Sequence, residues 1–284
     1  MKCDLCPRKC LVDRKKGEKG ICGQTENLKV ARAALHFWEE PCISGDAGSG
    51  AVFFSGCPLH CVFCQNENIA NGTVGKEISL ERLVDFFLEL QEKRANNINL
   101  VTPGHFVPQI VKALDQARKE GLTLPVVYNT SSYETVDTIK MLEGYVDIYL
   151  PDFKYMSPVL SKKYSHAPDY AEVAKAAIAE MVRQTGKAVF VNGDEDNLIL
   201  SGTIVRHLTL PGCMADSMQI LKYLHETYGD MIYISIMNQF TPLSNLEKYP
   251  ELNRRITDEE YETLVDYAIE IGIENGFIQE GDTA

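Results

Sequence analysis

Three cysteines, Cys57, Cys61 and Cys64, follow the spacing C-x3-C-x2-C, and the aromatic residue Phe63 directly precedes the last of them. Three thiolates at this spacing can hold three irons of a cubic [4Fe–4S] cluster. No fourth cysteine follows at close range, so one iron would stay open to an exogenous ligand, which is typical of a metal site that does chemistry. A three-cysteine zinc knuckle and chance clustering are the alternatives. The aromatic residue and the strand-like run before the loop disfavour both.

A second group of four cysteines at the N-terminus has the spacing C-x2-C-x3-C-x11-C, and its members are Cys3, Cys6, Cys10 and Cys22. Four thiolates close a tetrahedral zinc site or hold a second iron–sulfur cluster. Residues 1–30 are basic, punctuated by glycine and without an apolar period, so we expect a metal to take the place of a core there. Cys42 and Cys213 have no cysteine close to them in sequence, and we expect both to be free and buried.

Composition limits the class of protein. The chain has 284 residues, 45% of them hydrophobic, a net charge of −12 and a pI near 5.0. This charge argues against nucleic acid or an anionic membrane as the main partner. No apolar run approaches the roughly 20 residues of a transmembrane helix, and the N-terminus lacks the apolar core of a signal peptide. We therefore expect a cytoplasmic protein whose nine cysteines are metal ligands rather than disulfides.

Apolar runs alternate with segments of helical period along the rest of the chain. The expected strands are 51–54, 98–101, 124–128, 146–150, 203–208 and 231–236, and a small hairpin is expected from 188–191 and 198–200. The expected helices are 79–94, 107–119, 133–142, 170–184, 216–227 and 258–271, the first of them capped near Ser79. Six such units imply a parallel sheet, and a closed barrel would require about 250 residues of regular units. The sequence therefore predicts an α/β fold, an open, partial (β/α)6 barrel over residues 50–284, preceded by a cysteine-rich metal module (1–30) and a connector (31–49).

The pattern C-x3-C-x-aromatic-C resembles the signature of the radical S-adenosylmethionine (SAM) superfamily. The chain as a whole is similar to the group related to pyruvate formate-lyase activating enzymes, in its branch with a cysteine-rich N-terminus. The similarity includes residues 32–45, 101–105 and 206–212. It implies a partial barrel, a [4Fe–4S] cluster, bound SAM and a reductant such as flavodoxin or ferredoxin. The inserted ferredoxin domains of activating enzymes have another cysteine spacing, which favours zinc over a second cluster at the N-terminus.

The resemblance implies an oxidoreductase that reductively cleaves SAM to a 5′-deoxyadenosyl radical, which abstracts hydrogen from a glycine of a protein or peptide. A radical SAM enzyme acting on a small metabolite is one alternative. A non-catalytic iron–sulfur electron-transfer or metal-handling protein is another, and bound SAM would exclude it. A nucleic-acid-binding zinc module is disfavoured by the net charge.

Polar residues at the ends of the expected strands are the candidates for SAM contacts, since chemistry in such folds lies at the carboxyl ends of strands. Thr102 follows the second strand, where related enzymes carry an acidic residue that this chain lacks. Asn129 and Ser131 follow the third strand and match by position a family segment in which the first residue is an acid. The structural alternatives are a simple Pro-Gly turn after Thr102 and a helix cap formed by the segment of Asn129 and Ser131.

The later strand ends add charged groups. Asp152 and Lys154 lie two apart and face the same side of an extended segment, so Lys154 is expected to meet a carboxylate of SAM or substrate, with a surface ion pair as the alternative. Arg206 matches a family arginine that contacts the SAM carboxylate, whereas His207 points to the other face and is expected to be packed. Asn238 is a candidate for the adenine edge or a helix cap. The acidic pair Glu39 and Glu40 is expected to border a substrate entrance, and the alternative is that both residues lie in a solvated turn.

Overall fold

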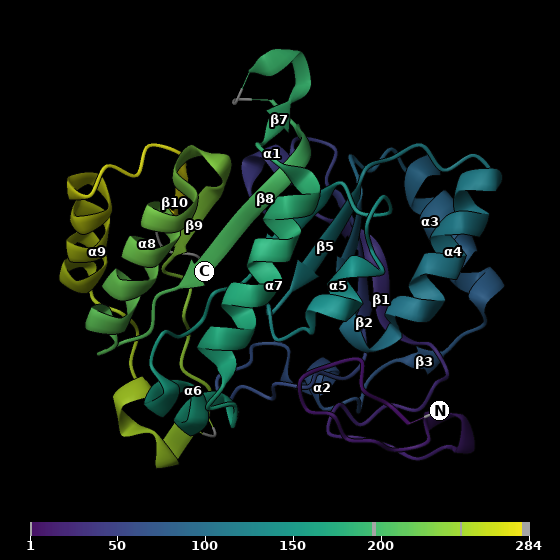
Figure 1. Cartoon of the computed structure of the whole chain (residues 1–284), viewed down its shortest axis with the longest axis horizontal. Helices are drawn as coiled ribbons and strands as arrows, with labels where there is room; N and C mark the ends of the chain where they lie inside the picture. Colours follow the sequence, from purple (N-terminus) through teal and green to yellow (C-terminus); the bar gives the residue numbers. More distant parts are fainter. Residues whose placement is uncertain (1, 195–196, 245, 280–284) are drawn as a thin grey trace.

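A ten-stranded sheet organises the part of the chain that the computed structural model describes, residues 2–194, 197–244 and 246–279 (Figure 1). The strand order is β10-β9-β8-β6-β5-β4-β2-β1-β3, with β7 paired to β8 off this path. The strands are β1 (Lys29–His36), β2 (Ser49–Phe54), β3 (Lys76–Glu77), β4 (Ile98–Val101), β5 (Val126–Thr130), β6 (Ile148–Pro151), β7 (Val189–Phe190), β8 (Ile199–Leu208), β9 (Tyr233–Met237) and β10 (Gly276–Ile278).

The predicted open barrel is confirmed. The six predicted strands correspond to β2, β4, β5, β6, β8 and β9, and each pairs in parallel with the next. Strand β10 adds a further parallel partner to β9, while β1 and β3 pair antiparallel at the other end. Within the described residues no ladder joins β10 to β1 or β3, so the sheet does not close.

The helices of the described residues are α1 (Pro41–Ser44), α2 (Glu67–Ala70), α3 (Leu80–Glu92), α4 (Val107–Lys119), α5 (Val136–Lys140), α6 (Pro158–Ser165), α7 (Tyr170–Thr185), α8 (Met214–Tyr228) and α9 (Asp258–Glu270). Of these, α3, α4, α5, α7, α8 and α9 cover the outer face of the sheet (Figure 1). The expected cap of α3 is present, since the Arg82 amide donates to the Ser79 hydroxyl at 3.2 Å. Each of the parallel strands β2, β4, β5, β6, β8 and β9 is followed along the chain by a helix.

The two faces of the sheet have different partners. Val126 and Tyr128 pack in the helix layer, whereas Val127 between them points to the inner face and packs with Cys42 and Ile43 of α1. This alternation is the period of two expected of a strand. Helix α1 thus fills the barrel interior, and the predicted burial of Cys42 is confirmed. Cys213, predicted to be buried as well, is only half-buried.

The segment expected to be a connector is more ordered than its sequence indicates. It contains most of β1, which pairs antiparallel with β2, and the plug helix α1. The predicted hairpin is present as the antiparallel pair β7 and β8, although residues 195–196 of its turn lie outside the described residues. No helix in the described part of the chain is long and apolar enough to cross a membrane.

Candidate functional site

A cavity of about 650 Å³ lies at the carboxyl ends of the parallel strands. Its lining draws on the ends of β1, β2, β4, β5, β6, β8, β9 and β10. Predicted site residues that line it are Cys57, Cys61, Phe63, Cys64, Thr102, Asn129, Ser131, Asp152, Lys154 and Arg206. Cys57 and Arg206, 149 positions apart in the sequence, therefore line one site, as the predicted topology requires.

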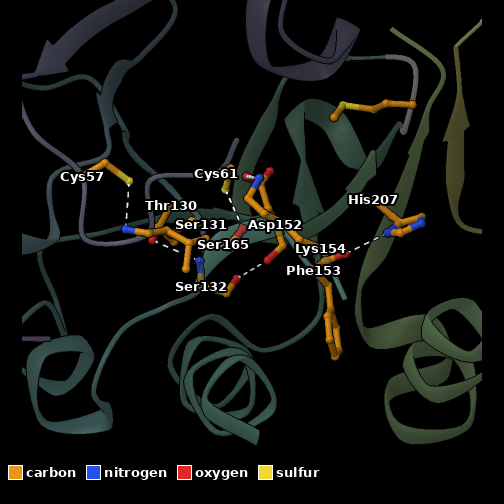
Figure 2. Close-up of polar contacts among 12 residues, drawn as sticks. Cys57, Cys61, Thr130, Ser131, Ser132, Asp152, Phe153, Lys154, Ser165 and His207 are labelled. Carbon is orange, nitrogen blue, oxygen red and sulfur yellow. Dashed lines mark hydrogen bonds and ion pairs between the residues drawn. The ribbon is translucent and has the colours of Figure 1, made fainter. Parts of the chain in front are cut away.

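The three cysteines share one loop after β2. Burial raises the pKa of the Cys57 thiol to about 12 and that of Cys64 to about 11, and the neighbouring Cys61 thiol adds to both shifts. The Ser165 hydroxyl donates to the Cys61 sulfur at 3.0 Å (Figure 2). These thiols would keep their protons unless a metal ion supplied compensating positive charge. Three half-buried thiols on one loop at the wall of a cavity suit a metal centre.

The loop is held from both sides. Phe63 is buried edge-on against Tyr155, Tyr164 and Phe240, with ring centroids 6.0–6.5 Å away. Gly56 opens the loop with φ +90°, and a Cβ there would lie 2.4 Å from the Cys22 carbonyl oxygen. Only glycine fits this close approach, which seats the loop against the N-terminal module.

The end of β4 is shaped by a residue that the sequence reasoning missed. Thr102 has φ +55°, and its amide donates to the Asn129 carbonyl at 2.9 Å. Glu134, buried behind this loop, accepts from the Thr130 hydroxyl at 2.8 Å, and its carboxylate packs on Gly104. Burial raises the pKa of Glu134 to about 7. Glu134, which follows β5, is thus a buried acid beside the β4 loop, and it does not line the cavity.

Asp152 and Lys154 form the predicted pair. The Lys154 ammonium lies 2.6 Å from Asp152 Oδ2, and both side chains are largely buried beside Cys61 (Figure 2). Burial opposes the lysine charge, but Asp152 together with Cys61 and Tyr170 raises the pKa of Lys154 above its usual value. The pair lines the cavity, so it is not the surface ion pair that was the alternative.

Arg206 also lines the cavity, but its guanidinium already binds two carboxylates of this chain. Its Nε and Nη2 donate to the two oxygens of Glu40 at 2.8 and 2.7 Å, and Nη2 also contacts Glu39. The side chains of Glu39 and Glu40 are only 7% and 5% exposed, so the solvated turn is wrong. Amides of Asn99 and Asn129 donate to the remaining Glu39 oxygen. Two carboxylates facing one guanidinium leave this wall with a surplus negative charge.

Two neighbouring predictions have opposite outcomes. His207 is buried, with its ring nitrogens 2.8 Å from the Phe153 carbonyl and from the Ser217 hydroxyl, and burial lowers its pKa to about 4, so the predicted packed histidine is confirmed. Asn238 does not line the cavity, whereas Met237 and Gln239 on either side of it do. The prediction for Asn238 is wrong because side chains alternate along the extended segment.

The N-terminal cysteines lie near one another. Burial raises the pKa of Cys6 to about 12, and Cys22 and Cys10 are close enough to add to this shift. Within residues 2–194, 197–244 and 246–279, no three Cys, His, Asp or Glu side chains converge as the ligands of a single ion would. A cubic cluster binds each thiolate through a different iron, so this does not bear on the cavity loop. The N-terminal metal stays a prediction.

The family can now be identified. A model of the radical SAM superfamily matches residues 51–197 of the 284-residue chain. The chain belongs to the radical SAM superfamily. The match starts in β2 and includes the cysteine loop, the ends of β4, β5 and β6, and Glu134. Membership implies a [4Fe–4S] cluster and SAM. The three thiols on the wall of one cavity fit that cluster by their number and their spacing in the sequence.

Three relatives place this radical SAM protein among known chains. An uncharacterized protein of Methanocaldococcus jannaschii is 27% identical over 275 residues, which are 94% of this chain and 74% of that protein. A mutant of spore photoproduct lyase has a TM-score of 0.55 at 13% identity, covering 88% and 80% of the two chains. Streptococcus suis SuiB bound to S-adenosylmethionine has a TM-score of 0.53 at 13% identity, and the match covers 80% of this chain and about half (48%) of SuiB. These structures show the shared fold.

Proposed function

We propose that this radical SAM protein reductively cleaves SAM and directs the 5′-deoxyadenosyl radical to a glycine of a partner protein or peptide. The observation that carries the proposal is the position of the three-cysteine loop on the wall of a cavity that lies between the two ends of an unclosed sheet. When bound, the cluster supplies the electron that breaks a carbon–sulfur bond of the sulfonium. The resemblance to activating enzymes supports the choice of a glycine.

The charges of the cavity wall suit the cationic part of SAM. The Asp152–Lys154 pair is neutral overall, whereas Glu39 and Glu40 together exceed the charge of Arg206 by one. A buried surplus of negative charge is stabilised by a nearby cation. The ammonium or sulfonium of SAM would supply that cation. Lys154 would be the better placed of the two basic residues for the SAM carboxylate, because it has one carboxylate partner whereas Arg206 has two.

The mouth of the cavity supports a polymeric substrate. Trp38, which follows β1, is 85% exposed and lines the cavity, and Ile278 on β10 is 46% exposed and lines it from the other end of the sheet. Large apolar side chains exposed at a cavity mouth are typical of a surface that binds another chain. Strand β10 pairs only with β9 in the described part of the sheet, so its outer edge is available for an extended peptide.

SAM cleavage is tested by anaerobic reconstitution with iron and sulfide, addition of SAM and dithionite, and assay of 5′-deoxyadenosine. Replacing Cys57, Cys61 and Cys64 together by Ala should abolish product and remove the iron and sulfide of the cavity site. A metal count on the same variant should still show roughly one zinc, or a residual cluster, at the N-terminal cysteines. Unchanged 5′-deoxyadenosine in this variant would refute the assignment of the loop.

The substrate class is tested with a variant of the cavity mouth. Reduced enzyme and SAM are mixed anaerobically with lysate from the source cell, and the mixture is examined for a glycyl-type electron paramagnetic resonance doublet. Trp38→Ala should lose the doublet but keep substrate-free SAM cleavage, whereas Ile269→Ala, on α9 and also exposed, should keep both. Deuterium that reaches 5′-deoxyadenosine only from a labelled small-molecule fraction would contradict a protein substrate and support a metabolic enzyme.

A further inference from the structure

The thiols of the cysteine loop differ in the groups that donate hydrogen bonds to them. Cys57 and Cys64 accept from backbone amides close to them in sequence. Cys61 accepts in addition from a side chain, the Ser165 hydroxyl of helix α6, at 3.0 Å (Figure 2). A loop of this shape supplies backbone amides by itself, whereas a hydroxyl 104 positions away in the sequence is a separate feature of this chain.

The Ser165 hydroxyl is itself hydrogen-bonded to a tyrosine. Its oxygen lies 2.8 Å from the hydroxyl oxygen of Tyr155. A hydroxyl carries one hydrogen, and that of Ser165 points to the Cys61 sulfur, so the tyrosine must donate to the serine. Tyr155 and Ser165 are both fully buried, so water does not replace either bond. The two bonds form a chain that ends on the sulfur, and each bond in such a chain polarises and strengthens the next.

Backbone contacts on both sides of Ser165 fix its position. The preceding carbonyl, that of Tyr164, accepts from the Val62 amide of the cysteine loop at 2.9 Å. The Ser165 carbonyl accepts from Nη2 of Arg8 at 3.0 Å, and Nε of the same arginine donates to the Pro58 carbonyl at 2.9 Å. One guanidinium of the N-terminal module therefore joins the cysteine loop to the end of α6. These contacts hold the serine hydroxyl against the sulfur.

The serine hydroxyl stabilises negative charge on this sulfur without carrying a charge of its own. Burial raises the pKa of the Cys61 thiol, and the Lys154 ammonium and the Ser165 hydroxyl both oppose that rise. Asp152, the ion-pair partner of Lys154, acts in the opposite direction. Hydrogen bonds to the sulfurs help to set the reduction potential of an iron–sulfur cluster. Since reduction adds negative charge, a donor at a ligand sulfur favours the reduced form and raises the potential.

We propose that Ser165 is a positioning residue that raises the reduction potential of the cluster through its hydrogen bond to the Cys61 thiolate, and that Tyr155 strengthens this bond. The inference rests on the cluster of the proposed function and not on the choice of substrate. One electron from an external donor is consumed for each SAM molecule cleaved. A higher potential would let a weaker reductant supply that electron, so the two hydroxyls would set which donors can drive the reaction.

The test compares Ser165→Ala and Tyr155→Phe with the control Ser161→Ala in the full-length, cluster-loaded protein. Ser161 lies on the same helix, is 1% exposed and donates to the Pro158 carbonyl at 3.3 Å, so its replacement removes a buried hydroxyl that bonds within the helix. Anaerobic potentiometric titration without SAM, followed by electron paramagnetic resonance, gives the midpoint potential. The signal of the variant with all three loop cysteines replaced by Ala is subtracted. Iron and sulfide counts compare cluster loading, and 5′-deoxyadenosine formation with dithionite is measured separately.

Ser165→Ala should lower the equilibrium constant for cluster reduction about 3- to 10-fold, and tenfold corresponds to a fall of about 59 mV for a one-electron couple. Tyr155→Phe should shift the potential in the same direction by less, and Ser161→Ala should keep the parental potential. A parental potential in a loaded Ser165→Ala protein would overturn the proposal. If that variant loads poorly, a parental potential in Tyr155→Phe overturns it instead, as does an equal shift in Ser161→Ala, which would reflect a general loosening of α6. A parent whose cluster titrates but that forms no 5′-deoxyadenosine would refute the proposed function, while the potentials still judge Ser165.

Discussion

Removing the Arg206 guanidinium should strongly destabilise the folded protein, because it would leave Glu39 and Glu40 buried without a cation. Arg206 is 12% exposed, so solvent screens the contact little, and its fork binds both oxygens of Glu40. Breaking a buried ion pair by removing one partner costs about 3–5 kcal/mol. Arg206→Met should therefore lower the free energy of unfolding by about that amount, whereas the charge-free triple variant E39Q/E40Q/R206M should lie within about 1–2 kcal/mol of the parent.

The loss should depend on pH in a defined direction. Burial opposes ionisation of Glu40, but Arg206 outweighs it and holds the pKa of that carboxyl below its usual value. In the parent this stabilisation is present above the unfolded pKa and is lost as the pH falls through the lower folded pKa. In Arg206→Met burial acts alone and raises the pKa of Glu40, so stability falls as the pH rises. The difference between the two proteins should be largest near pH 7–8 and shrink toward the unfolded pKa of about 4.5.

Anaerobic urea unfolding of the four proteins, parent, Arg206→Met, Arg206→Lys and the triple variant, measures these differences. The triple variant also separates two roles of Arg206. If the arginine serves only the two glutamates, the triple variant should bind SAM within a few fold of Glu40→Gln, which has the same net charge at this wall but keeps the arginine. If the arginine holds the SAM carboxylate, affinity should fall about 10- to 100-fold in a variant that is otherwise stable. A stable Arg206→Met protein with no pH-dependent loss would refute the reasoning about the buried carboxylates.

Two further predictions concern Glu134 and the loop after β4. The pKa of Glu134 is raised to about 7, so its burial destabilises the fold increasingly as the pH rises from about 4.5 to 7. Between pH 4.5 and pH 8 the free energy of unfolding of Glu134→Gln, measured with urea, should rise by on the order of 3 kcal/mol relative to that of the parent. Unfolding free energies that change in parallel with pH in the two proteins would contradict this. Gly104→Ala should lower the free energy of unfolding by about 1–3 kcal/mol, because a Cβ there would lie 2.4 Å from both Glu134 carboxylate oxygens. Adding Glu134→Ala should relieve most of that loss in a double-mutant cycle, and strict additivity would show that the two residues do not meet.

Sequence reasoning found the features that depend on local pattern. Apolar runs gave the six central strands, and the alternation of side chains along β8 correctly separated Arg206 from His207. The same alternation, applied after β9, would have chosen Met237 and Gln239 rather than Asn238. That error therefore had a signal that was available in the sequence.

Other features had no local signal. Glu39 and Glu40 bind an arginine more than 160 positions away, and nothing in an acidic pair before a proline indicates its burial. Helix α6 begins at Pro158 and carries Lys162 and Lys163, so its apolar period is weak. Strand β1 is rich in alanine, and its place in the sheet comes from pairing with β2 rather than from its own propensity. These features depend on long-range contacts, which a single sequence does not reveal.

The anchoring of the N-terminal module has a consequence for biosynthesis. Arg8 bonds to carbonyls at positions 165 and 166, and the Leu5 carbonyl accepts from hydroxyls at positions 135 and 138. The ribosome makes the module before these partners, which follow only after some 130–160 more residues, and synthesis of those residues takes about 7–30 s at 5–20 residues per second. During that interval the four N-terminal thiols stay undocked from these partners on a nascent chain, so the metal predicted to bind there would depend on which ion is available before the barrel exists.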